Sequence, residues 1–431
     1  MRDPALEWAR RLAGELLPEA SLQLATPGES AASAWARSGA LWLTGQPEEP
    51  PVLPSVPLPS CMDGAIAVLR ALAPGAELED VDGATLLGEH AALAGLARRG
   101  RISPGGSARL IPAADGWLVA NLPRDEDRRS LSAWLDIPPP READTWEAIS
   151  AAVASRPLNE LIERAYLLGL AVAAVRPDEP PPDQPWLRVA EQGPSGPPGA
   201  DRPLVVDLSS LWAGPLCADL LRRCGARVCK VESVRRPDGA RAGPAAFFDL
   251  LNAGKASVAL DFQDAAGGAA LHRLVGAADI VIEASRPRAL EQLGIDATAW
   301  VHEKPGRIWL SITAYGLRES ERERIGFGDD VAAASGLAWK VPGAPLFVAD
   351  AAADPLAAVH AAASVLAARR QGQARRLDIS LGAVMSAVCT VPPDGSEVQS
   401  FSIREPSARK SERTARILGA DTREILASYA N

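Results

Sequence analysis

Residues 204–260 read LVVDLSSLWAGPLCADLLRRCGARVCKVESVRRPDGARAGPAAFFDLLNAGKASVAL, and this stretch decides the fold. An apolar run at Leu204–Leu208 precedes a helix start at Gly214-Pro215, and the amphipathic pattern that follows predicts a helix to about Arg223. A second apolar strand ends at Glu232. The order predicts a β-α-β unit.

Cationic and amide side chains follow the predicted strands of this unit. Arg235, Arg236 and Arg241 come after the second strand, and Asn252 and Lys255 come before the next apolar run. Guanidinium and ammonium groups are the usual partners of phosphate oxygens. The unit is therefore expected to offer a cationic end to a phosphate-rich ligand.

A nicotinamide-dinucleotide site is the competing interpretation, because Glu232 ends a strand about 25 residues into a β-α-β unit. The first turn, Ser209–Gly214, contains one glycine and no G-x-G-x-x-G pattern. A backbone without those glycines cannot approach a pyrophosphate closely. The turn therefore disfavours NAD.

Composition limits the classes of partner. The chain has 431 residues and a formal net charge of −9, which disfavours nucleic acid or an anionic membrane as the main partner. No apolar run approaches the roughly 20 residues that span a bilayer, and the first 17 residues read as an amphipathic helix rather than a signal peptide. A cytoplasmic protein is expected.

The five cysteines include no C-x-x-C pair, so neither a disulfide framework nor a metal site is predicted. Only four histidines are present. General bases are therefore scarce, and the chemistry is expected to depend on carboxylates.

The same residues resemble the opening segment of the class III CoA-transferases, the CaiB/BaiF family. The resemblance rests on Ala213-Gly214-Pro215, Lys230-Val231-Glu232 and Gly254-Lys255, and it continues through Ala278–Ile295 and Ser311–Gly316. It implies an α/β fold with a Rossmann-like parallel sheet domain and a smaller α+β domain. It also implies acyl-CoA and a small carboxylic acid as substrates, no permanently bound cofactor, and a homodimer.

The order of segments departs from that family, whose Rossmann-like half comes first. Gly105–Pro123 and Trp146–Val175 are similar to the family's small domain, yet here they precede the β-α-β unit. The expected organisation is a helical segment at 1–97 resembling the rear of a large domain, a small α+β domain at 98–176, a proline-rich linker at 177–203, a Rossmann-like CoA-binding domain at 204–395, and a tail at 396–431 that packs back on the large domain.

An internal repeat with a period of about 297 residues accompanies this order. The three matched pairs are Trp35–Trp42 with Ala332–Trp339, Val68–Ala71 with Val365–Ala368, and, after a one-residue slip, Val81–Leu86 with Leu377–Leu381. A tandem duplication followed by circular permutation is our hypothesis. Unlike conformations of 31–95 and 324–390 would contradict it.

Asp354 is the candidate catalytic residue, because it matches the aspartate that precedes the helix D-x-x-x-G-x-x-A-A-x-x-x-L-A-A in the family, with Ala358 in place of the glycine. Pro355 favours the first helical position, which would place Asp354 at the cap, and Asp350 is the alternative. A structural helix cap without any catalytic role is the other interpretation of Asp354.

The reaction implied by the resemblance starts with a carboxylate that attacks a thioester, and no external base is needed. A helix N-terminus would keep Asp354 ionised, and Gly105 and Gly106 could present N–H groups to the oxyanion. The residues expected to contact CoA, by resemblance, are Trp212, Ala213, Arg235, Arg241, Asn252, Lys255 and Arg286.

Two alternatives remain open. The α-methylacyl-CoA racemases pair the aspartate with a histidine, but Phe327 stands where that histidine would be. A non-catalytic CoA-binding homologue or partner subunit is the other, because the tail at 404–426 has lost the glycine, glutamate and histidine of the family's closing motif.

Overall fold

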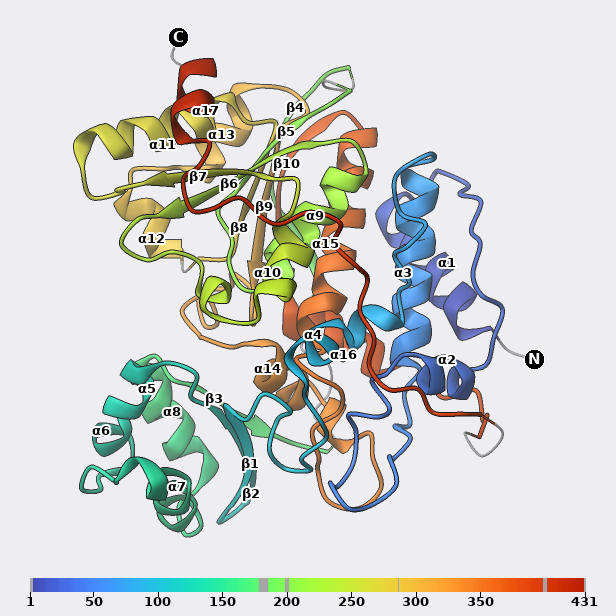
Figure 1. Cartoon of the computed structure of the whole chain (residues 1–431), viewed down its shortest axis with the longest axis vertical. Helices are drawn as coiled ribbons and strands as arrows, with labels where there is room; N and C mark the ends of the chain where they lie inside the picture. The colour runs from blue at the N-terminus through green and yellow to red at the C-terminus, as the bar shows by residue number, and fades with distance from the viewer. Residues whose placement is uncertain (1–2, 178–184, 198–200, 286, 398–400, 430–431) are drawn as a thin grey trace.

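The predicted β-α-β unit is present and lies at the centre of a larger sheet (Figure 1). The computed structural model describes residues 3–177, 185–197, 201–285, 287–397 and 401–429. Strand β5 (Leu204–Asp207) leads into helix α9 (Ala213–Arg223) and strand β6 (Arg227–Ser233), and β5 and β6 pair in parallel.

The strands of the described residues form one sheet of seven, the large sheet, and one of three, the small sheet. The large sheet has the order β4-β10-β9-β8-β5-β6-β7, with β4 antiparallel to β10 and the other pairs parallel. Its remaining strands are β4 Leu187–Ser195, β7 Ala256–Leu260, β8 Ile280–Glu283, β9 Ile308–Thr313 and β10 Gln373–Ser380. Counted from β5, the parallel strands lie in the order 3-2-1-4-5-6, which is the Rossmann order. The predicted α/β fold class is confirmed.

Helices cover both faces of the large sheet, which explains why its strands read as continuous apolar runs. Alternate residues of β5 point to opposite faces, so Val205 packs in one core and Val206 in the other. The first face carries α9, α10 Ala245–Asn252, α15 Ala353–Arg370 and α16 Leu381–Cys389, and the second carries α11 Ala265–Ala277, α12 Pro287–Gln292, α13 Ala297–Glu303 and α17 Thr422–Ser428.

The N-terminal helices add a further layer behind α15. Helix α1 (Pro4–Leu16) packs on α3 (Leu58–Leu72), and α3 packs on α15. The short helices α2 (Ala31–Arg37) and α4 (Glu89–Ala94) complete this segment. The first twelve residues of α3, Leu58–Leu69, are buried, and α15 is buried along nearly its whole length.

The small sheet and four helices form the small unit at the lower left of Figure 1. Its strands are antiparallel and its core is separate from that of the large sheet. The elements are β1 Ala108–Ala113, β2 Gly116–Asn121, β3 Ala171–Val175, α5 Asp125–Arg129, α6 Leu131–Leu135, α7 Thr145–Val153 and α8 Leu158–Leu168. The predicted small α+β unit is therefore present. Helix α14 (Gly328–Ala334) contacts β2 and β3 as well as α15 and α16, so it joins the small unit to the large sheet.

The prediction of a linker at 177–203 is wrong for its central part. Residues 187–195 form β4, the edge strand of the large sheet. An edge strand can tolerate proline, because one side of its backbone needs no ladder partner. Pro194 lies within β4, and the pairing with β10 shifts register between Gln373 and Arg375 and again between Arg376 and Leu377.

The structure agrees with two of the three matched pairs of the repeat hypothesis and disagrees with the third. Helices α2 and α14 share the same offset of 297, and each is followed by a serine and a glycine with positive φ, Gly39 and Gly336. Helices α3 and α15 overlap at that offset as well. The third match fails, because Val81–Leu86 leads into a 3-10 turn whereas Leu377–Leu381 belongs to strand β10 and the start of α16. A duplication limited to the helical pairs stays a hypothesis.

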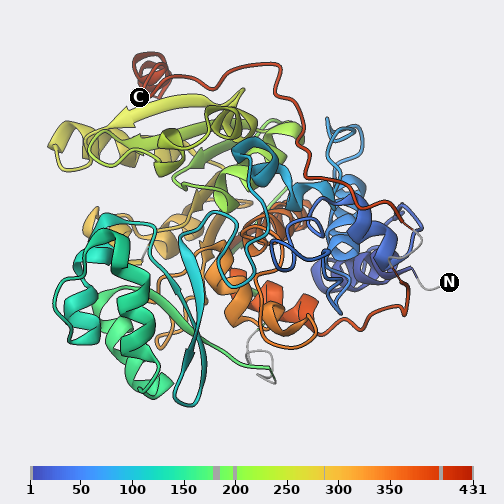
Figure 2. The same ribbon diagram turned by 60° about the horizontal axis from the view of Figure 1, so that its bottom comes forward.

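The C-terminal tail runs from the N-terminal helices to the far edge of the large sheet in both ribbon views (Figure 2). The Arg404 N–H donates to the Ala36 carbonyl at 2.8 Å, and the buried Arg409 guanidinium pairs with Glu89 at 2.6 Å. Further on, the Asp421 N–H donates to the Ser257 carbonyl on β7 at 2.9 Å. The tail thus fixes α4 relative to the sheet. None of the helices described is long and apolar enough to cross a bilayer.

Candidate active site

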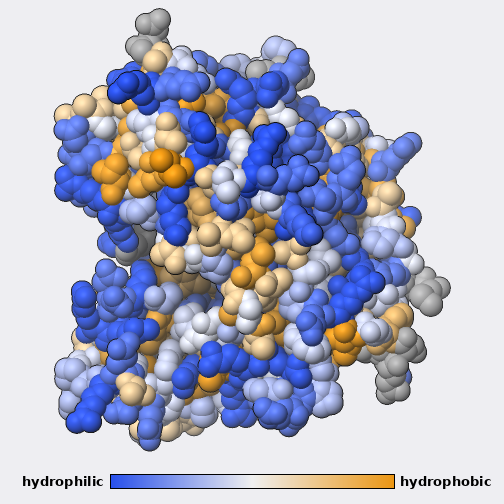
Figure 3. Space-filling model, viewed as in Figure 1, coloured by the Kyte–Doolittle hydropathy of each residue, from blue (hydrophilic) through white to orange (hydrophobic). Residues whose placement is uncertain are grey.

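Three carboxylates gather where α14, α15 and the loop between them meet. Asp354 lies in the first turn of α15, Asp350 in the loop before it, and Asp329 in the first turn of α14. The Ala351 N–H donates to Asp329 at 2.8 Å, which ties the loop to α14. Figure 3 shows a hollow in the surface between the large sheet and the small unit, the two parts that α14 joins.

Asp354 lies directly against Gly328. A Cβ atom at Gly328 would come within 2.3 Å of the Asp354 carboxylate and 2.5 Å of the Ala351 carbonyl oxygen. The backbone of Gly328 donates a hydrogen bond to that carboxylate. Burial, together with the charges of Asp329 and Asp350, raises the pKa of Asp354 to about 7.

The expectation that a helix N-terminus keeps Asp354 fully ionised is therefore wrong, because desolvation and like charges outweigh the donors. Its expected place at the cap is also wrong. Helix α15 begins at Ala353 and its cap residue is Ala352, so Asp354 is the second helical residue and Pro355 the third. The Asp354 carboxylate is thereby free of the capping role and faces α14.

Asp350 sits between two strained residues. Ala349 and Ala351 have φ angles of 60° and 43°, in the left-handed region that costs energy for a residue with a side chain. The Ala349 N–H donates to the Thr44 hydroxyl at 3.1 Å, which helps to hold this conformation. The strained backbone of this loop therefore holds the Asp350 side chain in one orientation.

In this orientation Asp350 contacts the imidazole of His90 on α4. Its Nδ1 lies 2.7 Å from an Asp350 carboxylate oxygen. Burial disfavours the imidazolium, but the hydrogen bond that it donates to Asp350 and the charges of Asp350, Asp329 and Asp354 outweigh burial and raise the pKa of His90. The His90 side chain is 25% exposed, so part of it is accessible to a ligand or solvent.

Aromatic rings connect this cluster to the turn after β5. The His90 ring lies 4.6 Å from that of Phe247 and 5.4 Å from that of Trp212, measured between centroids. Trp212 and Ala213 are both buried at the start of α9. The predicted ligand-contact residue Trp212 and the acidic cluster thus belong to one contiguous region.

The glycine turn of the small unit reaches the same cluster through Ser103. The Ser103 hydroxyl donates to Asp329, where burial and the charge of Asp350 raise the pKa of Asp329 to about 7. Gly106 N–H donates to the Ser103 carbonyl at 2.8 Å, and its φ of 82° favours glycine. Gly105 has open space around it. The structure therefore brings the turn with Gly105 and Gly106 to the edge of the acidic cluster.

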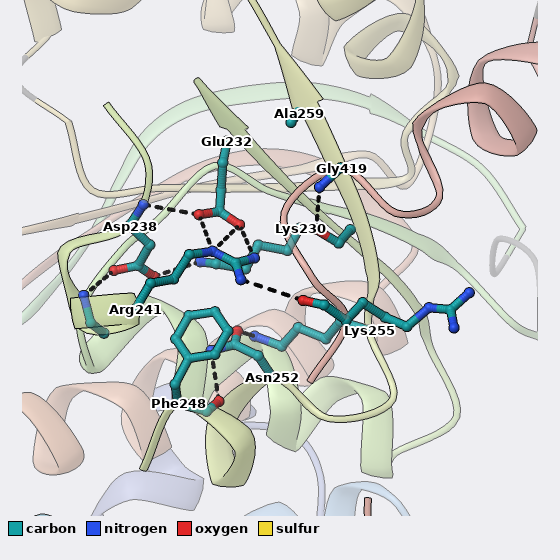
Figure 4. Close-up of polar contacts among 12 residues, drawn as sticks. Lys230, Glu232, Asp238, Arg241, Phe248, Asn252, Lys255, Ala259 and Gly419 are labelled. Atoms are coloured by element: carbon teal, nitrogen blue, oxygen red, sulfur yellow. Dashed lines mark hydrogen bonds and ion pairs between the residues drawn. The ribbon is translucent and has the colours of Figure 1, made fainter. Parts of the chain in front are cut away.

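The carboxyl ends of β5 and β6 hold a second, buried network (Figure 4). The Lys255 ammonium lies 3.0 Å from Asp207, 2.8 Å from the Pro215 carbonyl and 3.1 Å from the Asn252 side-chain oxygen. The Lys230 ammonium pairs with Asp238 at 2.8 Å. Burial lowers the pKa of Lys255, whereas the two ammonium groups overcome burial and lower the pKa of Asp207.

This network fixes the ligand-facing turns rather than contacting a ligand. Lys230 also donates to the Ser209 carbonyl at 3.0 Å, and Asp238 accepts from the Leu211 N–H at 2.9 Å. Leu211 has a φ of 68° and an exposed side chain. The paired charges therefore hold a strained, exposed turn after β5, at the edge where α/β sheets bind ligands.

The residues that were expected to contact phosphate differ in their burial and in their partners. Lys255 and Asn252 are each 3% exposed and hydrogen-bonded within the protein, an arrangement that does not present them to a ligand. Their direct contact with CoA stays a prediction. Arg241 pairs with Glu232 at 2.6 Å and lies over the Phe248 ring. Arg235 is exposed and pairs with Asp261 at 2.9 Å. Arg286 lies outside the described residues.

Sequence reasoning missed His90, Asp329 and Ser103. The Gly328-Asp329-Asp330 run carried a signal, since three polar or small residues open a helix there. His90 and Ser103 carried none, because only tertiary contacts bring them to Asp350 and Asp329. Among the residues that the structure describes, no group of histidine, cysteine and acidic side chains could hold a metal ion.

Gly328→Ala is expected to lower the activity of this site by about 100-fold, because small misplacements of a reacting group are costly. The added methyl must displace the Asp354 carboxylate and the strained Ala351 backbone. Crowding of this kind also destabilises the fold by about 1–3 kcal/mol. Rate measurements and denaturant unfolding check both effects.

Gly268→Ala on α11 is the matched control, since nothing lies within 4 Å of a Cβ there and its backbone is outside the left-handed region. It should leave the rate unchanged and stabilise the exposed helix slightly. Equal rates for Gly328→Ala and the wild type would show that Asp354 does not need its present position.

Comparison with known proteins places the three carboxylates of this site inside a recognised segment. Residues 203–414 match the sequence profile described as CoA-transferase family III. Succinate–glutarate CoA-transferase of Agrobacterium fabrum is 30% identical over 204 residues, covering 43% of this chain and 51% of that protein. Succinyl-CoA–D-citramalate CoA-transferase of Chloroflexus aurantiacus is 31% identical over 192 residues, covering 41% and 48%.

Among solved structures, a CAIB/BAIF family protein from Brucella suis matches with 29% identity and a TM-score of 0.41, covering 46% of this chain and 56% of that one. The chain spans about half the length of the curated relatives it matches. The matched segment contains Asp329, Asp350 and Asp354, whereas His90 and Ser103 lie outside it.

Proposed function

Residues 203–414 match the sequence profile of CoA-transferase family III, and from this similarity we propose that the chain moves CoA between an acyl-CoA thioester and a carboxylic acid, with Asp354 as nucleophile. CoA and acyl-CoA are substrates in this proposal and no resident cofactor takes part. The observation that carries the proposal is the Asp354 carboxylate held against Gly328 at the junction of the two units.

The chemistry proceeds through two kinds of covalent intermediate. The Asp354 carboxylate attacks the thioester carbonyl, the C–S bond breaks, and a mixed anhydride and CoA thiolate form. The thiolate then attacks the Asp354 carbonyl, which releases the donor acid and leaves an aspartyl-CoA thioester. The acceptor carboxylate repeats both steps in reverse, so that a new acyl-CoA leaves and the Asp354 carboxylate returns.

Three features support a nucleophilic role for Asp354 over a structural one. Its carboxylate does not cap its own helix. No ion pair to it occurs among the residues that the structure describes. Gly105 and Gly106 stand in the turn that reaches Asp329, and the Gly105 N–H would serve as an oxyanion donor in this proposal, whereas the Gly106 N–H already donates to the Ser103 carbonyl.

Transfer is expected to rise with pH through about 7 and to level off above. Asp354 must be ionised to attack, and burial with the charges of Asp329 and Asp350 raises its pKa to about 7. The active form therefore accumulates as the pH increases through that value. Initial rates in a constant-ionic-strength buffer series check this, with circular dichroism to exclude unfolding.

Asp329→Asn should shift this acidic limb to lower pH, because it removes a neighbouring negative charge that raises the Asp354 pKa. The amide oxygen can still accept the hydrogen bond from Ala351. An unchanged limb, or one moved to higher pH, would mean that Asp354 is not the group that titrates.

The function itself is tested with a panel of acyl-CoA donors and carboxylic acid acceptors, followed by chromatography of the acyl-CoA products. Acceptor-dependent formation of a new acyl-CoA supports the proposal. Tight CoA binding without exchange for any donor–acceptor pair would favour the non-catalytic homologue. Light scattering of the same sample tests whether the chain forms the homodimer that we propose.

Proton exchange at the α-carbon of an acyl-CoA is a second candidate function, and His90 favours it. Phe327 occupies the position of the racemase histidine, but the structure supplies another imidazole 2.7 Å from Asp350. A His–Asp pair beside Asp354 could remove and return an α-proton. Deuterium uptake at the α-carbon in D₂O that disappears in His90→Gln would support this activity, whereas no uptake by the wild type would exclude it.

A further inference from the structure

We propose that a cavity at the amino ends of β5, β6 and β7 binds a nucleotide. The cavity lies at the opposite ends of these strands from the turns that follow Asp207 and Ser233. It therefore takes no part in the proposed transfer chemistry. The proposal is independent of the function proposed for Asp354.

Distant segments build this cavity. Leu204, Arg227 and Ala256, the first residues of three parallel strands, form its floor, and the last turn of α9 and helix α17 form its walls. Its volume is about 460 Å³. That size lies within the range of about 300–1,000 Å³ that is usual for small-molecule sites.

Arginine side chains dominate the lining, and two of them are already paired. Arg222 donates to Asp219 at 2.8 Å, and Arg223 pairs with Asp219 at 2.9 Å and with Asp80 at 2.6 Å. These contacts hold the end of α9 and neutralise its guanidinium groups. Their charges do not require a ligand.

The other three arginines have no such partner. Arg202, Arg227 and Arg413 line the cavity, are exposed, and make no ion pair among the described residues. They come from the segment before β5, from the start of β6 and from the C-terminal tail. Glu77 is the carboxylate on the lining. Three unpaired guanidinium groups around one cavity favour a ligand with several negative charges.

The wall formed by the C-terminal segment indicates what the rest of the ligand is. Ile425 and Tyr429 of the C-terminal segment are half-buried and line the cavity. A phenol ring beside guanidinium groups suits a planar aromatic body attached to phosphates. A nucleoside diphosphate combines both parts, whereas inorganic phosphate alone would leave the apolar wall unused.

Isothermal titration of the full chain with ADP, pyrophosphate and adenosine tests this assignment. ADP and pyrophosphate should bind, more weakly as salt increases, and adenosine should bind far less. The double variant Arg202→Gln/Arg227→Gln should weaken ADP binding at least about tenfold, since hydrogen bonds to charged groups are lost. Tyr429→Ala should weaken ADP binding and leave pyrophosphate binding unchanged.

Arg273→Gln is the matched control, because Arg273 is an exposed arginine on α11 outside the cavity. It should bind ADP as the wild type does. Failure of the wild type to bind either anion would overturn the proposal. ADP binding that persists unchanged in the double arginine variant would also overturn it, since ADP would then occupy another site. None of these outcomes depends on CoA transfer.

Discussion

Asp354→Asn is expected to lower CoA transfer by roughly 10³-fold or more, because removal of a nucleophile eliminates the covalent route. The amide keeps the shape of the side chain and can still accept the hydrogen bond from Gly328. Its folding should therefore be preserved. Product formation from the best donor–acceptor pair, measured at pH 8 or nearby where the carboxylate is ionised, checks the effect.

Asp264→Asn provides the matched control for this variant. Asp264 is also a carboxylate at a helix start, where it accepts from Ala266 and Gly267 at the cap of α11. It should transfer CoA at the wild-type rate. A folded Asp354→Asn protein with undiminished transfer would remove Asp354 from the mechanism and leave Asp350 as the remaining candidate.

Lys255→Met is expected to destabilise the fold by about 3–5 kcal/mol, because breaking a buried ion pair leaves a carboxylate without its partner. Lys255 and Asp207 are 3% and 0% exposed, and their charged groups are 3.0 Å apart. The variant leaves Asp207 with the more distant Lys230 as its cation. Chemical unfolding monitored by circular dichroism measures the loss.

The double variant Asp207→Asn/Lys255→Met should be more stable than Lys255→Met alone, since no unpaired charge remains buried. Lys304→Met, at an exposed position after α13, is the control and should change stability by less than about 0.5 kcal/mol. Equal stability of Lys255→Met and the wild type would show that the network does not hold the ligand-facing turns.

Local patterns in the sequence were sufficient for the centre of the fold. The apolar runs around residues 204–208 and 227–232 became β5 and β6, and the Gly214-Pro215 start with its amphipathic pattern became α9. Strands that are buried on both faces appear in the sequence as continuous apolar runs, which can be recognised without knowledge of distant contacts. Strand β4 was missed, because Pro194 and the prolines on either side of the strand resemble a linker, and because its partner β10 lies about 180 residues away.

The candidate site was only half predictable, for a related reason. Asp354 was found through its helix and its family motif, but its surroundings come from distant segments. His90 and Ser103 reach Asp350 and Asp329 across more than 200 residues of sequence. Lys255 was predicted as a phosphate contact because its charge is visible in the sequence, whereas its buried partner Asp207 is not recognisable as such before folding.

The most direct test is the intact mass of the wild-type protein after incubation with an acyl-CoA, followed by fragmentation of the peptide that contains Asp354. The account predicts an aspartyl-CoA thioester on Asp354 that hydroxylamine converts to a hydroxamate. A covalent adduct on another residue, or transfer of CoA without any adduct at Asp354, would contradict it.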